Sequence, residues 1–256
     1  MCYNISRKVE VRGLSIKAIV FDKDGTLVDY GNFWIPVSKC ATEYIFESAG
    51  VPLSRVDAHL YDLGVRGDDV DIKSPLAKGD HKGIIDLLLV EIKAVRPEAT
   101  FSEAARLMIE GYGKDSKQKG KVLPTCDNMC ELLKSLRSLG IIVALVTSDE
   151  ISGAEICLEK LGVKELFDEI ITAELDKPTK PDPYLMNRFM KKYGLSQSEV
   201  IMVGDTETDI LFAKNSGVFS VGVGKSAESR EYLSLIGASV TMRDISGVYE
   251  LVRNFK

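Results

Sequence analysis

The sequence predicts an α/β protein: a doubly wound, mostly parallel Rossmann-like sheet with a helical domain inserted after the first strand. Three observations predict this fold. Short runs of apolar, β-branched residues recur along the chain, as expected of strands buried on both faces of a parallel sheet. From about residue 120 onward, segments with helical spacing separate these runs. Between about residues 30 and 119 the alternation stops, and only helical patterns are found.

The first predicted strand covers residues 16–22 and reads Ile-Lys-Ala-Ile-Val-Phe-Asp. Later runs of the same kind are rich in β-branched residues and end at Asp, Thr, Ser or Gly. They predict further parallel strands over residues 141–147, 169–172, 200–204 and 218–223. Because helical segments separate them, crossover connections within one sheet are the expected topology.

Two helices are predicted between these strands from their spacing and caps. Apolar residues from Met129 to Leu139 repeat at intervals of three and four, and Gly140 is expected to end that helix. Ser152 and Glu155 form a capping-box pattern, which predicts the start of the next helix, ending near Gly162.

The interval that breaks the alternation is predicted to be an all-helical cap domain. Helices are expected over residues 37–49, 83–95 and 100–111, the last of them capped by Thr100 and Glu103. Segments rich in Gly and Lys near residues 111–121 are typical of a mobile joint. We therefore expect a core of residues 1–29 and 120–256 and a cap of residues 30–119.

Composition and charge exclude several classes of protein. The chain has 256 residues, of which 45% are hydrophobic and 28% charged, so neither a disordered nor a fibrous chain is expected. The net charge is −5 and no basic cluster is present, which argues against nucleic-acid binding. No apolar run approaches the roughly 18 residues that a membrane-spanning helix needs. His59 and His81, the two histidines, are expected at the surface.

The location expected for the protein is the cytoplasm. The first twelve residues contain Arg7, Lys8 and Arg12 where a signal peptide needs an apolar stretch. The five cysteines have no Cys-x-x-Cys spacing, and an odd number of thiols is typical of a reducing compartment.

Acidic residues follow two of the predicted strands, where ligands bind in open α/β sheets. Asp22 and Asp24 end the first strand, and alternation along an extended chain directs them to one side and Lys23 to another. Asp205 and Asp209 follow a later strand, four residues apart and therefore on one face of a starting helix. Four carboxylates this close repel one another unless a divalent cation is bound, and oxygen ligands favour Mg²⁺.

The remaining strand ends offer groups that suit a phosphoryl group. Thr147 and Ser148 supply hydroxyls and amides, and Lys180 supplies a cation. These groups therefore predict a site for a phosphoryl group.

Four motifs together carry a family resemblance: Asp22 to Leu27 (DKDGTL), Thr147-Ser148, Lys180-Pro181 and residues 204–209 (GDTETD). Their order and spacing resemble the haloacid dehalogenase superfamily, in its phosphoglycolate-phosphatase-like branch. The resemblance extends over nearly the whole chain from Ile16. It implies that the inserted helical segment is the single cap domain of that branch.

The resemblance implies a role for each acid. Asp22 would be the nucleophile that forms an aspartyl-phosphate, and Asp24 the general acid and base. Mg²⁺ would be held by the Asp22 carboxylate, the Asp24 carbonyl oxygen and Asp205, with Asp209 either a direct ligand or hydrogen-bonded to one.

The resemblance also implies the phosphate ligands. Thr147 and the Ser148 amide would bind phosphate oxygens, while Lys180 would neutralise charge on Asp22 and on the transferring group. A second Lys-Pro pair at Lys177 is the alternative to Lys180. The implied activity is that of a Mg²⁺-dependent phosphomonoester phosphatase that acts on a small phosphorylated metabolite.

Two other functions remain open on the sequence. A sugar phosphomutase of the same superfamily would pass the phosphoryl group to a second hydroxyl instead of water. A regulatory module similar to a response-regulator receiver would keep the phosphoryl group as a signal.

Overall fold

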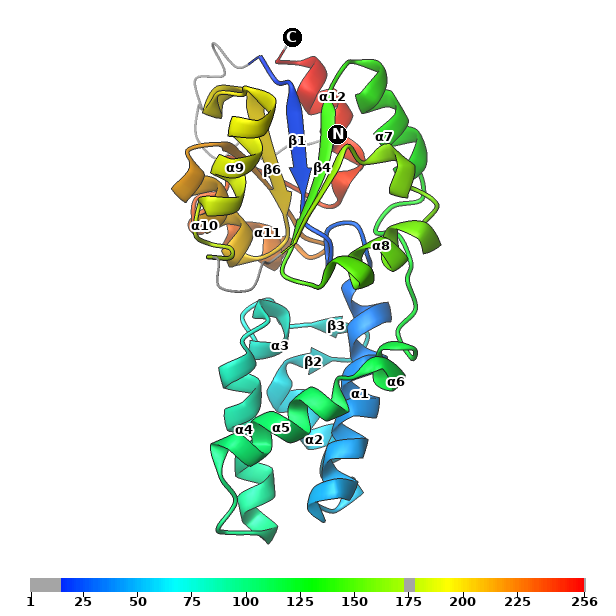
Figure 1. Cartoon of the computed structure of the whole chain (residues 1–256), viewed down its shortest axis with the longest axis vertical. Helices are drawn as coiled ribbons and strands as arrows, with labels where there is room; N and C mark the ends of the chain where they lie inside the picture. The colour runs from blue at the N-terminus through cyan, green and yellow to red at the C-terminus, as the bar shows by residue number, and fades with distance from the viewer. Residues whose placement is uncertain (1–14, 173–177, 256) are drawn as a thin grey trace. The chain divides into compact units, whose positions relative to one another are not determined.

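The structure, a computed structural model, describes residues 15–172 and 178–255. The chain divides into two compact units. The first contains residues 15–29 and 124–255 of the described chain, and the second contains Tyr30–Leu123. The second unit is therefore an insertion into the first (Figure 1).

A six-stranded parallel sheet forms the centre of the first unit, in the order β5-β4-β1-β6-β7-β8. The central strand pairs on both sides in register, Phe21 with Leu145 and with Val203. The fold class predicted from the sequence is therefore confirmed. The strands are β1 (Ala18–Phe21), β4 (Ile142–Thr147), β5 (Glu169–Thr172), β6 (Val200–Gly204), β7 (Phe219–Val223) and β8 (Val240–Met242).

Helices cover both faces of this sheet. Alternate residues of β1 point to opposite faces, so they pack against different sets of helices. Ile19 and Phe21 are buried in one apolar cluster, with α7, α8 and α12. Ala18 and Val20 are buried in another, with α9 and α10 (Figure 1). The helices of this unit are α7 (Met129–Ser138), α8 (Ile151–Lys160), α9 (Tyr184–Tyr193), α10 (Glu207–Ser216), α11 (Ala227–Leu235) and α12 (Val248–Arg253).

The expected capping box at Ser152 is wrong. Helix α8 begins at Ile151 with Glu150 as its N-cap, so Ser152 already lies inside the first turn. The turn before the helix is held by Asp149, whose Oδ1 accepts a hydrogen bond from the amide of Glu150 at 2.9 Å. Strand β8 was not predicted, because its three residues are too few to show a pattern.

The second unit is mainly helical and has its own apolar core. Thr100 caps α5 as expected, accepting a hydrogen bond from the amide of Glu103 at 3.3 Å. The elements of this unit are α1 (Tyr30–Ala49), α2 (Val56–Leu63), β2 (Val65–Arg66), β3 (Asp69–Val70), α3 (Pro75–Lys78), α4 (His81–Val95), α5 (Phe101–Gly111) and α6 (Lys114–Lys117).

Two expectations for the inserted segment are wrong. It is not all-helical, because β2 and β3 form a short antiparallel hairpin around Gly67, whose positive φ of 65° allows the turn. His59 is not a surface residue: its side chain is 1% exposed and lies against Phe46, with ring centroids 5.4 Å apart. His59 shares the buried face of α2 with Val56 and Leu63, so its position in the helix decides its burial.

In the described part of the chain, every helix is too short or too polar to cross a membrane.

Candidate active site

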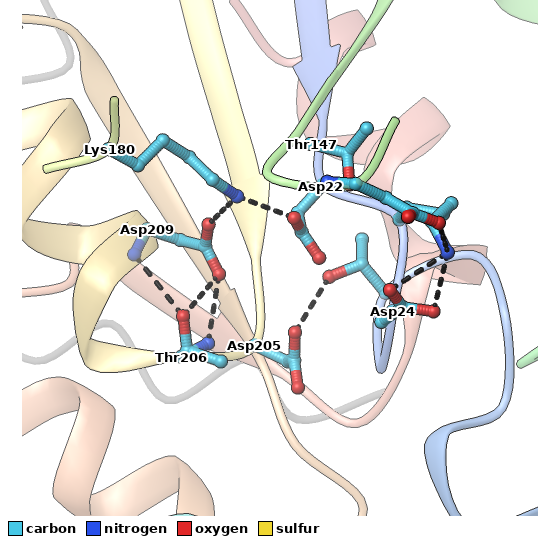
Figure 2. Close-up of polar contacts among 10 residues, drawn as sticks. Asp22, Asp24, Thr147, Lys180, Asp205, Thr206 and Asp209 are labelled. Carbon is cyan, nitrogen blue, oxygen red and sulfur yellow. Dashed lines mark hydrogen bonds and ion pairs between the residues drawn. The ribbon is translucent and has the colours of Figure 1, made fainter. Parts of the chain in front are cut away.

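The carboxyl ends of three neighbouring strands bring the site together. Asp22 follows β1 directly and its amide donates to the carbonyl oxygen of Val203 in β6 at 2.8 Å. Thr147 is the last residue of β4, and Asp205 follows β6. Because β1 lies between β4 and β6, these residues share one edge of the sheet (Figure 2).

Three carboxylates and one ammonium form the centre of the site. Asp22, Asp205 and Asp209 each offer an oxygen, and these oxygens lie within 4.8 Å of one another. The Lys180 ammonium contacts Oδ1 of Asp22 at 2.5 Å and Oδ1 of Asp209 at 2.7 Å (Figure 2). Four residues predicted from separate parts of the sequence therefore meet at one point.

Burial and mutual repulsion disfavour the ionised form of the carboxylates in this cluster. The pKa of Asp22 is raised to about 7, because burial and the neighbouring Asp209 raise it by more than Lys180 lowers it. Burial and the charges of Asp22 and Asp209 also raise the pKa of Asp205 well above its ordinary value. Burial disfavours the charge on Lys180, but Asp209 and Asp22 outweigh it and raise its pKa. Three ionised carboxylates and one ammonium leave two negative charges, which a divalent cation would neutralise.

The cluster offers the oxygen ligands that Mg²⁺ prefers, so its donor set fits that ion. Asp209 has a partner on each carboxylate oxygen: Lys180 on Oδ1, and the amide and hydroxyl of Thr206 on Oδ2 at 3.1 and 2.7 Å. Among the described contacts, Asp22 and Asp205 each have a partner on one oxygen only, Lys180 and Thr26 respectively. Asp22 and Asp205 therefore have the oxygens most available to a cation.

The loop after β1 approaches Asp205 closely enough to require glycine. Gly25 has a φ of +84°, and a Cβ built on it would lie 2.0 Å from Oδ2 of Asp205. In the same loop, the Thr26 hydroxyl donates to Oδ1 of Asp205 at 3.2 Å. The glycine and the threonine of the first motif thus place the Asp205 carboxylate.

Asp24 has a partner that the sequence did not predict. The Lys23 ammonium lies 2.8 Å from both carboxylate oxygens of Asp24, and 3.3 Å from Oδ2 of Asp149. Lys23 is 0% exposed. Burial disfavours its charge, but Asp24 and Asp149 outweigh that effect and raise its pKa. Lys23 was expected to point away from the two acids. This expectation is wrong for the ammonium of Lys23, because the long side chain curves back to Asp24.

The predicted phosphate ligands differ in their surroundings. Thr147 is buried, and its hydroxyl accepts a hydrogen bond from the amide of Asp149 at 3.1 Å. Ser148 follows it and is exposed. The alternative lysine, Lys177, lies outside the described residues.

Sequence reasoning gave no site role to Lys23, Thr26, Asp149 and Thr206, which contact the predicted acids or one another. Thr26 and Thr206 were inside quoted motifs, and a Thr three residues before an Asp is a capping-box pattern that indicates the Thr206–Asp209 pair. Lys23 lies between Asp22 and Asp24, beyond the end of β1, and no sequence pattern there indicates that its side chain is buried.

Comparisons with known proteins agree with this geometry. A family model described as haloacid dehalogenase-like hydrolase matches residues 16–217. A phosphoglycolate phosphatase of Vibrio cholerae is 29% identical over 238 residues, covering 93% of this chain and 97% of the relative. The pyrophosphatase PpaX of Halalkalibacterium halodurans is 28% identical over 59% of this chain and 70% of the relative. The crystal structure of a predicted phosphoglycolate phosphatase from Haemophilus somnus has the same fold, with a TM-score of 0.68, 20% identity, and coverage of 93% and 99% of the two chains.

Proposed function

We propose that this chain, which belongs to the haloacid dehalogenase-like hydrolase family, is a Mg²⁺-dependent phosphatase that forms an aspartyl-phosphate on Asp22. One observation carries the proposal. The Asp22 carboxylate, at the end of the central strand, contacts the Lys180 ammonium at 2.5 Å and has an oxygen within 4.8 Å of oxygens of Asp205 and Asp209. Such an arrangement presents a carboxylate nucleophile where negative charge can be neutralised.

The reaction has two steps on this chain's residues. An Asp22 oxygen forms a bond to phosphorus while the bond from phosphorus to the leaving oxygen breaks, and Asp24 gives that oxygen its proton. Water then attacks the phosphorus of the aspartyl-phosphate and Asp24 takes a proton from the water. The bond between phosphorus and the Asp22 oxygen breaks, which frees the Asp22 carboxylate and releases inorganic phosphate. Positioning and charge stabilisation provide most of the rate in such transfers.

The surrounding groups hold the phosphoryl oxygens. Thr147 and the Ser148 amide would bind them by hydrogen bonds, and Lys180 would balance their charge. Asp22, Asp205 and the carbonyl oxygen of Asp24 would hold Mg²⁺. Asp209 would keep Lys180 in place or join them as a ligand. When bound, Mg²⁺ supplies positive charge to the phosphoryl oxygens and to the carboxylates.

We propose a small phosphorylated metabolite as the substrate class, and the inserted unit as the cap domain that selects it. The names of the relatives support this, since they name phosphoglycolate phosphatases and pyrophosphatases.

We also propose a cytoplasmic location for the protein. The four cysteines of the described residues are free thiols, which supports this location.

The test measures Mg²⁺-dependent phosphate release by the full chain from phosphoglycolate, sugar phosphates, nucleoside monophosphates and an aryl phosphate. Asp22→Asn should abolish release, while Asp57→Asn, at an exposed position on α2, should leave it unchanged. Isomerised sugar phosphate without free phosphate would indicate a mutase instead. A lasting phosphoryl group on Asp22 without turnover would indicate a regulatory module.

A further inference from the structure

Lys23 is a fully buried lysine between two acids at the edge of the sheet. Its side chain is 0% exposed, whereas those of Asp24 and Asp149 are 20% and 18% exposed. Its ammonium lies 2.8 Å from both oxygens of Asp24 and 3.3 Å from Oδ2 of Asp149. It therefore connects the loop after β1 to the loop after β4.

Packing alone does not explain this lysine. Burying an ammonium costs several kcal/mol of desolvation, which its carboxylate partners must offset, and an apolar side chain of similar length would fill the space without that cost. The charge of Lys23 is therefore used for its contacts and not for the stability of the core.

Direct contact with a substrate does not explain it either. Its side chain is 0% exposed, so its ammonium reaches a substrate only through the residues that it touches. Of these, Asp24 is the acid and base of the proposed reaction, and the contact to both of its oxygens keeps the carboxylate turned toward the ammonium.

The other end of the connection is itself fixed. Oδ1 of Asp149 accepts a hydrogen bond from the Glu150 amide at 2.9 Å, at the start of α8. A Cβ built on Gly153, in the first turn of that helix, would lie 2.8 Å from Oδ2 of Asp149. A side chain at position 153 would displace this carboxylate, so Gly153 leaves the space in which Asp149 contacts Lys23.

We propose that Lys23 is a positioning residue that orients the carboxylate of Asp24 for proton transfer, with Asp149 and Gly153 as its support. This inference rests on the proposed function, because it assigns the orientation of the residue that protonates the leaving group. Lys23 acts through Asp24 and does not itself contact the reacting atoms.

The inference predicts a dependence on the leaving group. An alkoxide leaving group needs its proton in the transition state, whereas 4-nitrophenolate leaves readily without one. kcat/KM reports the steps up to formation of the aspartyl-phosphate, so it isolates this proton transfer. Misplacing Asp24 should lower kcat/KM for alkyl phosphates far more than for 4-nitrophenyl phosphate.

The experiment compares Lys23→Met with wild type at saturating Mg²⁺. We expect kcat/KM for the best alkyl phosphate to fall about 10- to 100-fold, which is less than the roughly 100- to 10,000-fold contribution of general acid catalysis because Asp24 is misplaced and not removed. For 4-nitrophenyl phosphate we expect a fall of less than about 3-fold. Gly153→Ala, which displaces Asp149 without removing a charge, should show the same pattern more weakly. An equal loss for both substrates, or no loss, would overturn the inference.

A double-mutant cycle separates orientation from a general structural effect. In an Asp24→Asn background, Lys23→Met should cause no further loss with the alkyl phosphate, because the group that it orients is absent. A further loss as large as in the wild-type background would contradict the inference. If Lys23→Met does not fold, Gly153→Ala completes the cycle.

Crystal structures of wild type and Lys23→Met provide a readout that does not depend on turnover. The Asp24 side chain should occupy one orientation in wild type and a different one, or several, in the variant. An unchanged Asp24 would overturn the inference. A wild-type protein without Mg²⁺-dependent phosphate release would contradict the proposed function instead, while these structures would still decide the orientation of Asp24.

Discussion

The ammonium of Lys180 lies 2.5 Å from Oδ1 of Asp22, and both side chains are almost completely buried. The two residues are 158 positions apart in the sequence. Their contact makes a buried carboxylate compatible with a nucleophilic role, because the ammonium favours the ionised form that attacks phosphorus.

Lys180→Met should remove activity and destabilise the fold. The substitution leaves Asp22 and Asp209 buried without their ammonium partner, and breaking a buried pair in this way costs about 3–5 kcal/mol. Phosphate release should fall at least about 100-fold, as expected when charge stabilisation is lost. Urea unfolding and kcat measure the two effects.

The matched control is Lys192→Met. Lys192 pairs with Glu169 at 3.0 Å, but its side chain is 56% exposed. An exposed pair contributes about 1 kcal/mol or less, so stability and activity should both stay close to wild type. Equal effects of the two substitutions would contradict the role given to Lys180.

Removing divalent cations should make stability depend on pH through Asp22. The pKa of Asp22 is raised to about 7 in the metal-free fold, so between pH 4 and 7 the folded chain holds a proton that the unfolded chain has lost. Its contribution to stability is therefore greatest at low pH and is lost as the pH rises through 7. Thermal unfolding in EDTA, compared with Asp22→Asn, measures this loss.

Added Mg²⁺ should reverse the effect most strongly at high pH, because the cation binds the ionised carboxylates. The increase in Tm caused by Mg²⁺ should grow from pH 5 to pH 8 and be smaller in Asp22→Asn. An increase of the same size at every pH, or the same size in both proteins, would argue against Asp22 as a ligand.

His59 should give the inserted unit an acid sensitivity of the opposite sign. Burial lowers the pKa of His59 to about 4, below its ordinary value of 6.5. The unfolded chain therefore binds a proton between pH 6.5 and 4 that the folded chain does not, and stability is lost as the pH falls through this range. A pKa difference of this size corresponds to roughly 3 kcal/mol.

His59→Leu should remove this part of the acid sensitivity, as measured by urea unfolding at pH 7 and pH 4.5. His81→Gln, at the exposed second histidine, is the control and should keep it. Identical pH profiles for wild type and His59→Leu would show that His59 is not a buried neutral group.

The strands and the acids could be predicted because each depends on local sequence. A strand buried on both faces needs a continuous apolar run, and β1, β4 and β6 all have one. Asp22, Lys180, Asp205 and Asp209 could be placed together because parallel strands end at one edge of the sheet.

The sequence did not predict the contact of Lys23, the burial of His59 or the short β2–β3 hairpin. Lys23 lies two residues beyond the end of β1, and its flexible side chain brings the ammonium to Asp24. His59 is buried because it lies on the face of α2 that packs against Phe46 of α1. The β2–β3 hairpin has two residues in each strand, too few for an alternation to be visible.

Gly25→Ala should weaken cation binding specifically. Two effects act on this residue: a left-handed φ of +84°, which costs about 1–2 kcal/mol for alanine, and a Cβ that would lie 2.0 Å from Oδ2 of Asp205. Gly140 has a similar φ of +75° and nothing within 4 Å of a built Cβ, so Gly140→Ala reproduces the backbone effect alone. Both variants should lose a similar amount of stability from backbone strain.

Only Gly25→Ala should displace the Asp205 carboxylate. We therefore expect the Mg²⁺ concentration for half-maximal activity of this variant to rise at least about 10-fold, as when groups that orient metal ligands are changed. The test is a titration of activity with Mg²⁺ in the two variants. The same Mg²⁺ concentration for half-maximal activity in both would mean that Asp205 does not hold the cation. A shift confined to Gly25→Ala would mean that the glycine of the first motif is needed to place Asp205.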